Sequence, residues 1–331
     1  MNRKVETMED DNVSYRVVCA AGGTGSATSL TITDYKPFVK YGTWYVEETG
    51  ELIRVGATPT STSVTVARGV GGTSAATIPA GATLRYAGAA YTENEELQAA
   101  VSTQKSFPYN YIQDFRDAIE MSDHQIESAS YGGKDLPYQM KKKLEEHLRA
   151  IENALWFGSR GVVSSTTQYT LGGILEFITT NLTDVSASGL LTRETFLQFL
   201  KDVFRFGGKK KMCFHGSGLA TAMDAWGWEL QRINPGAEKL GIKINEYITP
   251  FGTLGCVYHP QVFEGDTFSG HAVVIDPQYF ALKYFAGIGK THMGDHTKST
   301  SKTGQNKEYR TNLTLVRQLE KASGVLSGVA G

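Results

Sequence analysis

The sequence predicts an α+β protein, and three stretches carry that prediction. The first is a single long helix over residues 135–157, near the middle of the chain. The second is a block of short strands within residues 17–95, where Val, Thr, Tyr, Gly and Ser dominate and helix formers nearly vanish. The third is the part after the long helix, where helices and strands alternate before a final long strand. Together they predict a small β domain inserted into a larger mixed domain.

The long helix is predicted by its apolar periodicity. Apolar residues recur three or four positions apart and form one stripe: Leu136, Met140, Leu144, Leu148, Ile151 and Leu155. Asp135 suits the N-cap, and Pro137 suits the first turn, where its missing N–H costs nothing. Gly158 suits a left-handed C-cap. At 1.5 Å per residue the helix is roughly 33 Å long, about twice the usual length.

Composition describes an ordinary folded chain. The 331 residues are 40% hydrophobic and 20% charged, which is enough for a sizeable core. Lys and Arg number 33 against 34 Asp and Glu, so the net charge of −1 advertises neither a nucleic acid nor a membrane partner. The 36 glycines exceed the usual share of about 7% and indicate many tight turns.

The cysteines and the first residues indicate a protein made in the cytosol. Three scattered cysteines, Cys19, Cys213 and Cys256, argue against a disulfide framework and against a zinc site. The first 18 residues contain no apolar signal-peptide core, and no window approaches 18 uninterrupted apolar residues. We therefore expect neither a signal peptide nor a transmembrane helix.

The β domain is predicted from strands separated by turns rich in Gly or Pro. Several of these strands alternate apolar and polar residues, and they cover 29–33, 43–48, 51–56, 63–69 and 82–88. Five or six short strands within about 75 residues predict a small β-barrel or β-sandwich. Residues 1–16, which precede the domain, are expected to form an extended arm.

The remaining elements are assigned by their local signals. Thr192 is expected to cap a helix whose buried face consists of Phe196, Leu197, Leu200, Val203 and Phe204. Residues 242–260 predict a hairpin that turns at Pro250–Gly252. Residues 271–285 predict two short strands, 286–305 a polar loop, and the region around Leu313 and Leu315 a long final strand.

Two short motifs invite an enzymatic interpretation, and neither is complete. The glycine-rich run Gly22–Ser26 lacks the following Lys-Ser/Thr and the helix of a phosphate-binding loop, so a flexible hairpin explains it better. His215 and Ser217 lie where a strand meets a helix, as in a nucleophile elbow, but that motif needs glycine at position 215. A helix cap is the plainer role for Ser217.

Metal and cofactor sites are not expected. His292, Asp295 and His296 offer metal-ligating groups, but they lie in a predicted loop with no further ligands nearby in sequence. The basic run Lys141–Lys143 on the long helix is explained either by a solvated helix face or by a salt-sensitive contact with a phosphate backbone. No catalytic set remains, so we expect a protein without cofactor, metal or enzymatic activity.

The segment Asn110–Gly158 resembles the major capsid proteins of tailed bacteriophages. The resemblance is narrowest to a subfamily in which an Asn-Tyr-x-Gln-x-Phe-Arg stretch, here Asn110–Arg116, precedes a Ser-rich turn at Ser122 and the long helix. Residues 68–81 also resemble an Arg-Gly…Gly-Thr…Ala-Gly element of the inserted β domain in that subfamily.

This resemblance implies the Hong Kong 97-type fold. It implies that 1–16 and 105–130 form the two strands of an extended loop, with the β domain, 17–95, inserted between them. It further implies a peripheral domain from 131–171 and 286–320, built on the spine helix 135–157, and an axial domain from 172–285. Contacts with neighbouring subunits are then expected from the extended loop, through Tyr111, Gln113, Phe115 and Arg116.

The predicted function is that of a major capsid protein. The resemblance implies self-assembly into hexamers and pentamers of an icosahedral shell that encloses double-stranded DNA, with assembly in the host cytoplasm and final residence in the virion. Scaffolding, portal and decoration proteins are the further partners implied. The basic run Lys141, Lys142 and Lys143 is then a hypothesis for nonspecific contact with packaged DNA on the inner side of the shell.

Three alternatives remain at the level of sequence. An encapsulin-like nanocompartment shares the fold, but the inserted β domain argues against it because decoration and lattice stabilisation suit a phage exterior. An α/β hydrolase with an N-terminal β binding module rests on His215 and Ser217. A carbohydrate-binding or tail-associated protein would use the β domain as its binding module.

Overall fold

The chain forms two compact units. A computed structural model describes residues 3–10, 14–91, 93, 105–128, 135–163, 168–187, 190–226, 234–235, 245–265, 267–285, 290–297 and 304–329. One unit combines Met1–Glu9 with Phe107–Gly331, and the other comprises Asp10–Ser106. The range predicted for the β domain, 17–95, falls within the second unit. The acidic stretch 92–100, for which the sequence predicts a short helix or a linker, lies outside the described residues except for residue 93.

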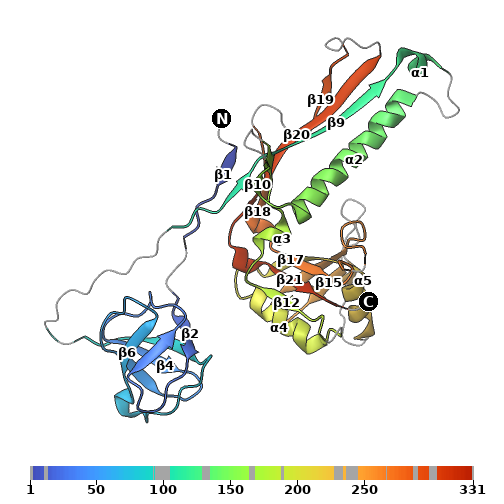
Figure 1. Cartoon of the computed structure of the whole chain (residues 1–331). Helices are drawn as coiled ribbons and strands as arrows, with labels where there is room; N and C mark the ends of the chain where they lie inside the picture. The colour runs from blue at the N-terminus through green and yellow to red at the C-terminus, as the bar shows by residue number, and fades with distance from the viewer. Residues whose placement is uncertain are drawn as a thin grey trace. The chain divides into compact units, whose positions relative to one another are not determined.

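The second unit is a closed β-barrel. Its strands are β2 (Arg16–Ala21), β3 (Ser29–Ile32), β4 (Gly42–Val46), β5 (Leu52–Val55), β6 (Ser63–Ala67) and β7 (Thr83–Ala89), with a 3₁₀ turn, η1 (Val70–Gly72), before β7. The strands close in the order β2-β3-β6-β5-β4-β7, and all neighbours are antiparallel (Figure 1). Closure leaves no unpaired edge. The structure thus selects the barrel over the sandwich.

Alternating side chains fill the barrel. In β6, exposed and buried residues alternate at every position, so Val64 and Val66 point into the core. The centre is occupied by Trp44, which is fully buried and stacks on Phe38 with the ring centroids 4.0 Å apart. This alternation is the signal that predicts the strands from sequence.

In the first unit, the 13-residue strand β20 (Gln305–Arg317) organises a four-stranded antiparallel sheet. One edge of β20 pairs with β9 (Gln113–Met121), and the other pairs with β19 (His292–Asp295) and β18 (Phe280–Tyr284) (Figure 1). The expected polar loop at 286–305 therefore contains a strand within its described part. This strand, β19, forms because its backbone hydrogen-bonds to the edge of β20.

The extended-loop strand predicted over 105–130 is divided among three elements. β8 (Tyr109–Tyr111) pairs with β1 (Lys4–Glu6), whereas β9 pairs with β20, and α1 (Asp123–Glu127) follows. Among the described residues, the two segments expected to form the extended loop, 1–16 and 105–130, pair with each other over three residues each. The physical reason is the apolar inner face of β9, where Phe115, Ile119 and Met121 are buried and need a covering helix.

The long helix α2 (Asp135–Phe157) supplies this cover and has the bounds expected from the sequence. The residues directly before Asp135 lie outside the described part of the chain, so its role as the N-cap stays a prediction. The buried positions are His147, Ile151 and Trp156, whereas Leu148, expected in the apolar stripe, is 51% exposed. Where α2 packs on β9 and β20, the side chain at position 147 faces the sheet and that at 148 does not, although His147 is polar and Leu148 apolar.

Gly158 ends α2 for a reason other than the expected one. It does not adopt the left-handed backbone conformation. Instead, a Cβ atom at this position would collide with the carbonyl oxygen of Ala154 and lie 2.6 Å from that of Leu171. Glycine is required because the chain at 171–173 crosses the end of the helix, where the Gly173 N–H donates to the Gly158 carbonyl oxygen at 2.7 Å.

A seven-stranded mixed sheet forms the rest of the unit. In spatial order its strands are β12 (Leu182–Asp184), β21 (Gly324–Ser327), β17 (Ala272–Ile275), β13 (Lys210–His215), β16 (Thr253–Tyr258), β15 (Asn245–Ile248) and β14 (Asn234–Pro235). β15 and β16 form the hairpin predicted over 242–260. The predicted axial range, 172–285, includes β18, which pairs with β20, and leaves out β21, which pairs with β17 in this sheet.

Helices cover both faces of the seven-stranded sheet. On one face, α4 (Arg193–Val203) and α5 (Ser217–Ala225) pack on Cys213, Cys256 and Val274. On the other, α3 (Ile174–Phe177) and Trp156 of α2 pack on Val273 and Ile275. As predicted, Thr192 caps α4 by accepting a hydrogen bond from the Thr195 N–H, but the buried face contains Phe199 in place of Leu197. Four short elements complete the unit: β10 (Gly161–Val162), β11 (Tyr169–Thr170), η2 (Pro277–Tyr279) and η3 (Glu320–Ala322).

Candidate functional site

The strand–helix junction at His215 and Ser217 is not arranged for nucleophilic catalysis. The buried His215 ring uses Nδ1 to contact the Gly216 carbonyl oxygen at 2.9 Å, and burial lowers its pKa. Ser217 begins α5, and Gly216 holds the N-cap position without a side-chain cap, so the role expected for Ser217 as a cap is wrong. A side chain at Gly216 would collide with the Ser269 carbonyl oxygen, which explains the glycine.

The residues considered for a metal lie on or after the edge strand β19. His296 contacts Glu308 of β20 at 3.1 Å, and Asp295 accepts a hydrogen bond from the Thr297 N–H at 3.0 Å. Over the described ranges, no three His, Cys, Asp or Glu residues are grouped so that they could hold a metal ion. Within the same ranges, no helix is long and apolar enough to span a membrane.

The glycine-rich run at 22–26 connects β2 and β3 and is held by a buried ion pair. The Arg68 guanidinium bonds both carboxylate oxygens of the fully buried Glu51 at 2.7 Å, and it also donates to the Thr24 carbonyl oxygen. Glu51 in turn accepts from the N–H groups of Gly69 and Ala76. Burial opposes ionisation of this carboxyl, but the hydrogen bonds from Arg68 and from the two backbone amides leave the pKa of Glu51 lowered. The element at 68–81 is therefore a clamp that joins two loops of the barrel.

Two polar side chains of the motif at Asn110–Arg116 hydrogen-bond to the backbone at 171–172, where the chain crosses the end of α2. The buried Asn110 amide donates to the carbonyl oxygens of Gly172 and Leu315, and its Oδ1 accepts from the Gly172 N–H at 2.7 Å. The Gln113 side-chain oxygen accepts from the Leu171 N–H at 2.9 Å. These contacts explain why an Asn and a Gln stand at these two positions of an otherwise extended segment.

Of the four residues expected to contact neighbouring subunits, two are committed to their own chain. Phe115 is 9% exposed and packs on Ile151 and Leu313, and the Gln113 side chain accepts the hydrogen bond from the Leu171 N–H. Arg116 is exposed on the face of β9 that points away from α2. Tyr111 is half-buried and contacts the ring of Tyr169 at 5.2 Å.

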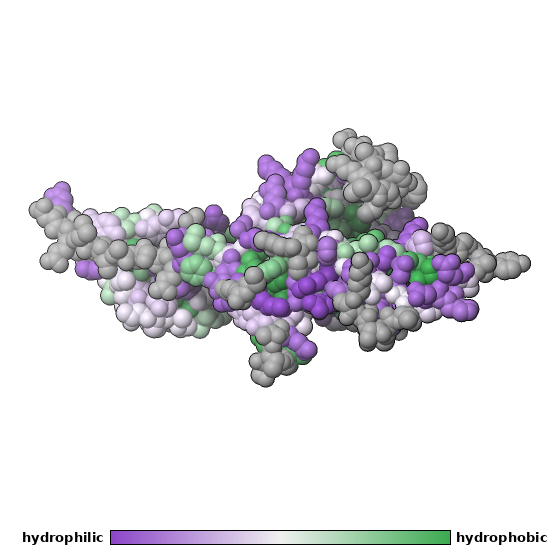
Figure 2. Space-filling view, turned by 90° about the horizontal axis from the view of Figure 1, so that it is seen from above, coloured by the Kyte–Doolittle hydropathy of each residue, from purple (hydrophilic) through white to green (hydrophobic). Residues whose placement is uncertain are grey.

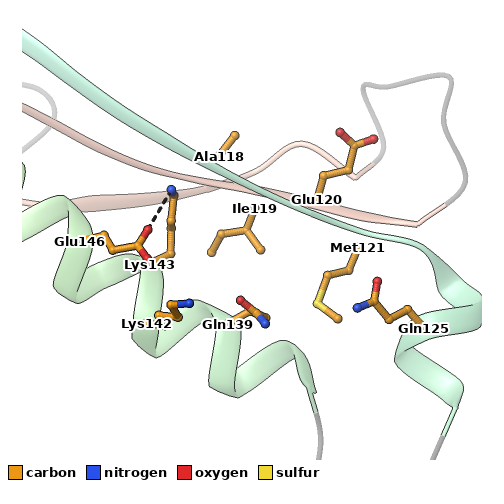
Figure 3. A pocket seen from close by; sticks show the side chains of 9 residues that line it. All are labelled: Ala118, Ile119, Glu120, Met121, Gln125, Gln139, Lys142, Lys143 and Glu146. Atoms are coloured by element: carbon orange, nitrogen blue, oxygen red, sulfur yellow. Dashed lines mark hydrogen bonds and ion pairs between the residues drawn. The ribbon is translucent and has the colours of Figure 1, made fainter. Parts of the chain in front are cut away.

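The basic run on α2 borders an open hollow between α2, β9 and α1. This hollow has a volume of about 280 Å³ and is lined by Ala118, Ile119, Glu120, Met121, Gln125, Gln139, Lys142, Lys143 and Glu146 (Figure 3). In Figure 3, Ile119 and Met121 point from β9 towards the helix, whereas Ala118 and Glu120 lie on the other side of the strand. Of the two lysines there, Lys143 is paired with Glu146 at 3.1 Å, so the hollow carries no strong charge.

The three lysines differ in their partners. Lys143 Nζ lies 3.1 Å from Glu146 and 3.6 Å from Asp117, and the hydrogen bond to Glu146 is the main cause of its raised pKa. Lys141 and Lys142 are exposed. A phosphate group therefore has access to Lys141 and Lys142, whereas Lys143 is neutralised within the chain.

A series of buried side-chain hydrogen bonds joins α2 to the sheet, and no sequence motif predicts it. The fully buried His147 ring bonds Asp117 of β9 through Nδ1 at 2.7 Å and Thr311 of β20 through Nε2 at 2.8 Å. Because a carboxylate only accepts hydrogen bonds, Nδ1 carries a proton. The Thr311 hydroxyl continues the chain to the Thr291 hydroxyl at 3.1 Å. Two polar residues at inward positions of apolar patterns, Asp117 and His147, are the only sequence signal for this contact.

Hydrophobic and hydrophilic residues are interspersed on the surface. On the face shown in Figure 2, hydrophobic residues form small patches separated by hydrophilic ones. Several large apolar residues are nevertheless more than half exposed, among them Leu182, Leu190 and Val163 of the first unit. Small scattered patches are compatible with several modest contacts and with no single deep binding site.

Comparison with known proteins assigns the chain to a class. The sequence model of the family described as SU10 major capsid protein matches residues 31–330. A major capsid protein of Pseudomonas phage PaMx41 is 24% identical over 284 residues, which are 82% of this chain and 68% of that protein.

Two solved structures of protein shells are similar to this chain. A chain of the holo-SrpI encapsulin complex from Synechococcus elongatus gives a TM-score of 0.50 at 12% identity, over 69% of this chain and 78% of that one. A chain of the capsid of a native GTA particle gives a TM-score of 0.48 at 10% identity, over 73% of this chain and 80% of that one. At such low identity the encapsulin likeness bears on the fold alone.

Proposed function

Because this chain belongs to the SU10 major capsid protein family and is a major capsid protein of a tailed phage, we propose that it assembles into hexamers and pentamers of an icosahedral shell around double-stranded DNA. The expected Hong Kong 97-type fold is confirmed, and the protein is a component of the virion. The observation that carries the proposal is the family match, which spans nearly the whole chain, including most of the barrel. The shell would assemble in the host cytoplasm with scaffolding, portal and decoration proteins.

The contacts between α2 and the sheet of the first unit support a role as a stiff shell subunit. The 23-residue helix α2 and the 13-residue strand β20 are linked by His147, whose ring contacts both neighbouring strands. A buried polar contact fixes one register between the helix and the sheet, because a shift by one residue would leave its groups unpaired. In the proposed shell, the peripheral domain would be built on this strut, and the axial domain on the seven-stranded sheet.

Contacts between subunits are proposed for the outer side of β9 and for the strands beside it. Arg116 and Tyr111 have side chains that reach the surface, and they would contact neighbouring subunits directly. Gln113 and Phe115 would act from within, by holding the chain at Leu171 and the helix at Ile151. Replacing Arg116 with Ala is then expected to weaken assembly while leaving the fold of the monomer unchanged.

Assembly is tested by negative-stain electron microscopy and sedimentation velocity of the purified 36.1 kDa chain. Closed shells, or rings of five and six subunits, would support the proposal. A homogeneous monomer or dimer that fails to assemble, even with its scaffolding protein, would contradict it and reopen the binding-module alternative. A fluorophosphonate probe that labelled Ser217 would separately support the hydrolase alternative.

Contact with packaged DNA is proposed for Lys141 and Lys142, with Lys143 as their structural neighbour. Each lysine–phosphate contact adds to the salt dependence of binding. Replacing Lys141 and Lys142 with Glu should therefore lower the temperature at which filled particles release DNA, most strongly at low salt. Lys201→Glu, an exposed lysine on α4, is the matched control. Equal genome retention in both variants would contradict the proposed DNA contact.

A further inference from the structure

Four tyrosines gather at one end of the barrel. Tyr15 directly precedes β2, Tyr41 directly precedes β4, Tyr86 lies in β7 and Tyr91 follows β7. Backbone hydrogen bonds bring them together, because the Tyr86 N–H donates to the Tyr15 carbonyl oxygen at 2.9 Å and the Ala90 N–H donates to that of Tyr41 at 3.3 Å. We call these four residues the tyrosine cluster.

The rings of the tyrosine cluster contact one another in two pairs. Tyr15 and Tyr86 are stacked with their centroids 5.4 Å apart, and Tyr41 and Tyr91 meet edge to face at 6.3 Å. Burial raises the pKa of Tyr86, and the nearby phenols of Tyr91 and Tyr15 raise it further. The two ring pairs lie near each other, because Tyr91 of one pair is close enough to raise the pKa of Tyr86 in the other.

Two members of the cluster are open to solvent. Tyr15 is 66% exposed and Tyr91 is 49% exposed. The barrel core is complete without them, because Tyr86 rests edge to face on the fully buried Trp44 at 5.3 Å. Large exposed rings over a rigid base are typical of binding surfaces, since aromatic side chains supply contact area at little cost in conformational entropy.

Two hydrogen-bond donors lie beside the ring of Tyr41. Lys40 Nζ and Arg54 Cζ each lie 4.5 Å from the centroid of the Tyr41 ring. The Arg54 guanidinium also donates to the Ala90 carbonyl oxygen at 3.4 Å, while its Nε is buried without a hydrogen-bond partner. A ligand bearing hydroxyl groups would find both an aromatic surface and donors within one small area.

Tyr41 has a strained backbone. Its φ of +65° is in the left-handed region, which costs a residue with a side chain roughly 1–2 kcal/mol and glycine almost nothing. Bulky residues in this region are uncommon and concentrate at ligand clamps and other functional sites. The Tyr41 side chain is thus held in place against a local preference for glycine.

The charge of the barrel unit argues against a polyanionic ligand. Residues 10–106 contain seven Lys and Arg against nine Asp and Glu. Single-stranded nucleic acid also stacks on aromatic rings, but it requires a positively charged groove for its backbone. A neutral ligand with an apolar face and several hydroxyls fits better, and a pyranose ring has both.

We propose that the tyrosine cluster, with Lys40 and Arg54, binds neutral saccharides. The pyranose face would stack on the exposed rings of Tyr15 and Tyr91, and sugar hydroxyls would hydrogen-bond to the phenols and to the Arg54 guanidinium. This function is additional to shell building. It would give the capsid an affinity for glycans, separate from subunit contacts.

The test uses the whole chain, in whatever assembly state sedimentation shows. The purified protein is applied to a printed glycan array of neutral hexose and hexosamine oligosaccharides, and the best binders are titrated calorimetrically. Binding should change little between low and high salt, because no ion pair with the ligand is involved. Measuring assembly first keeps a failure of shell formation distinct from a failure of saccharide binding.

Substitutions locate the site. Tyr15→Ala combined with Tyr91→Ala should weaken binding by at least about tenfold, since stacked aromatic contacts are worth that much in pairs. Both side chains are exposed, so the barrel should remain folded, which circular dichroism verifies. Tyr45→Ala is the matched control, because Tyr45 is 43% exposed on β4 of the same barrel and outside the cluster. Its affinity should equal that of the parent chain.

Three results would overturn the proposal. One is an array on which no neutral saccharide binds. Another is binding that the double variant retains in full, which would place the ligand elsewhere on the protein. The third is tighter and strongly salt-dependent binding of a single-stranded oligonucleotide through the same tyrosines, which would make the cluster a base-stacking surface.

Discussion

Replacing His147 with Leu tests whether the buried polar chain joins α2 to the sheet. Leucine fills the space without leaving a large cavity, so the main loss is of two hydrogen bonds, to Asp117 and to Thr311. A bond to a charged group is worth about 1.5–3 kcal/mol and one to a neutral group about 0.5–1.5 kcal/mol. In the variant, Asp117 still has Lys143 as a partner and its side chain is 28% exposed, so losing its hydrogen bond to His147 costs less than the upper value. We expect a total loss of about 2–3 kcal/mol.

Hydrogen–deuterium exchange measures this loss where it occurs. A local destabilisation of about 2–3 kcal/mol accelerates exchange roughly 30- to 150-fold, since each 1.4 kcal/mol is a factor of ten. The acceleration should appear in peptides of α2, β9 and β20, whereas barrel peptides serve as the internal control. His124→Leu, which replaces an exposed histidine on α1, should change exchange of α2 very little.

His147 and Thr311 share one hydrogen bond, so their substitutions should not be additive. Thr311→Val combined with His147→Leu should cost less than the sum of the two single changes, because both remove the same hydrogen bond. Strict additivity would show that His147 and Thr311 act independently. Unchanged exchange in α2 of the His147→Leu variant would refute the assignment of a linking role altogether.

Three further predictions follow from other buried contacts. Glu51→Gln should destabilise the barrel by about 3–5 kcal/mol, because it leaves the nearly buried Arg68 charge unpaired. In the parent chain, the stability that Glu51 contributes is fully present above the pKa of about 4.3 that its carboxyl has in the unfolded chain. This contribution is lost as the pH falls through the lowered pKa of the folded state. Burial lowers the pKa of Lys211 to about 8, so the unfolded chain binds more protons and stability of the first unit should rise between pH 8 and about 10.4. Gly158→Ala should cost about 1–3 kcal/mol, because its Cβ meets two backbone carbonyl oxygens.

Each of these three has its own measurement. Urea unfolding followed by exchange in barrel peptides reports on Glu51. The control is Glu48→Gln, an exposed carboxylate on the same barrel that accepts a hydrogen bond from the Thr83 N–H, which the amide oxygen of Gln can also accept. A stability that stayed flat from pH 8 to 10 would contradict the Lys211 prediction, and Lys211→Met should remove the pH dependence. For Gly158, thermal unfolding is compared with Gly161→Ala, where the new Cβ makes only an ordinary contact; equal melting temperatures would contradict the steric argument.

Elements with strong local signals are the ones that the sequence predicts correctly. The bounds of α2, the cap at Thr192 and the hairpin of β15 and β16 depend on periodicity, on capping chemistry and on turn residues within a few positions. The barrel strands likewise follow from alternation. Closure into a barrel does not follow, because it depends on pairing between β2 and β7, which lie far apart in sequence.

Pairing over long distances along the chain accounts for the errors. β9 and β20 pair residue 113 with 313, and no local pattern announces that partner. Within the described residues, the segments 1–16 and 105–130 pair with each other only through β1 and β8, and β9 pairs with β20 instead. The expectation of a polar loop at 286–305 missed β19 for the same reason. This strand has little apolar character of its own and forms by pairing with the edge of β20.

The contacts that fix the first unit are polar groups at positions where apolar patterns predict none. Asn110 joins β8 to Leu315 of β20, His147 joins α2 to β9 and β20, and Lys211 donates to three backbone carbonyl oxygens, including that of Ala322. Apolar packing tolerates small shifts, whereas a buried donor without its acceptor costs about 1–3 kcal/mol. Each contact therefore admits one arrangement of the elements it joins. A shell subunit needs that uniqueness, because small errors of shape within one subunit are repeated at every equivalent interface.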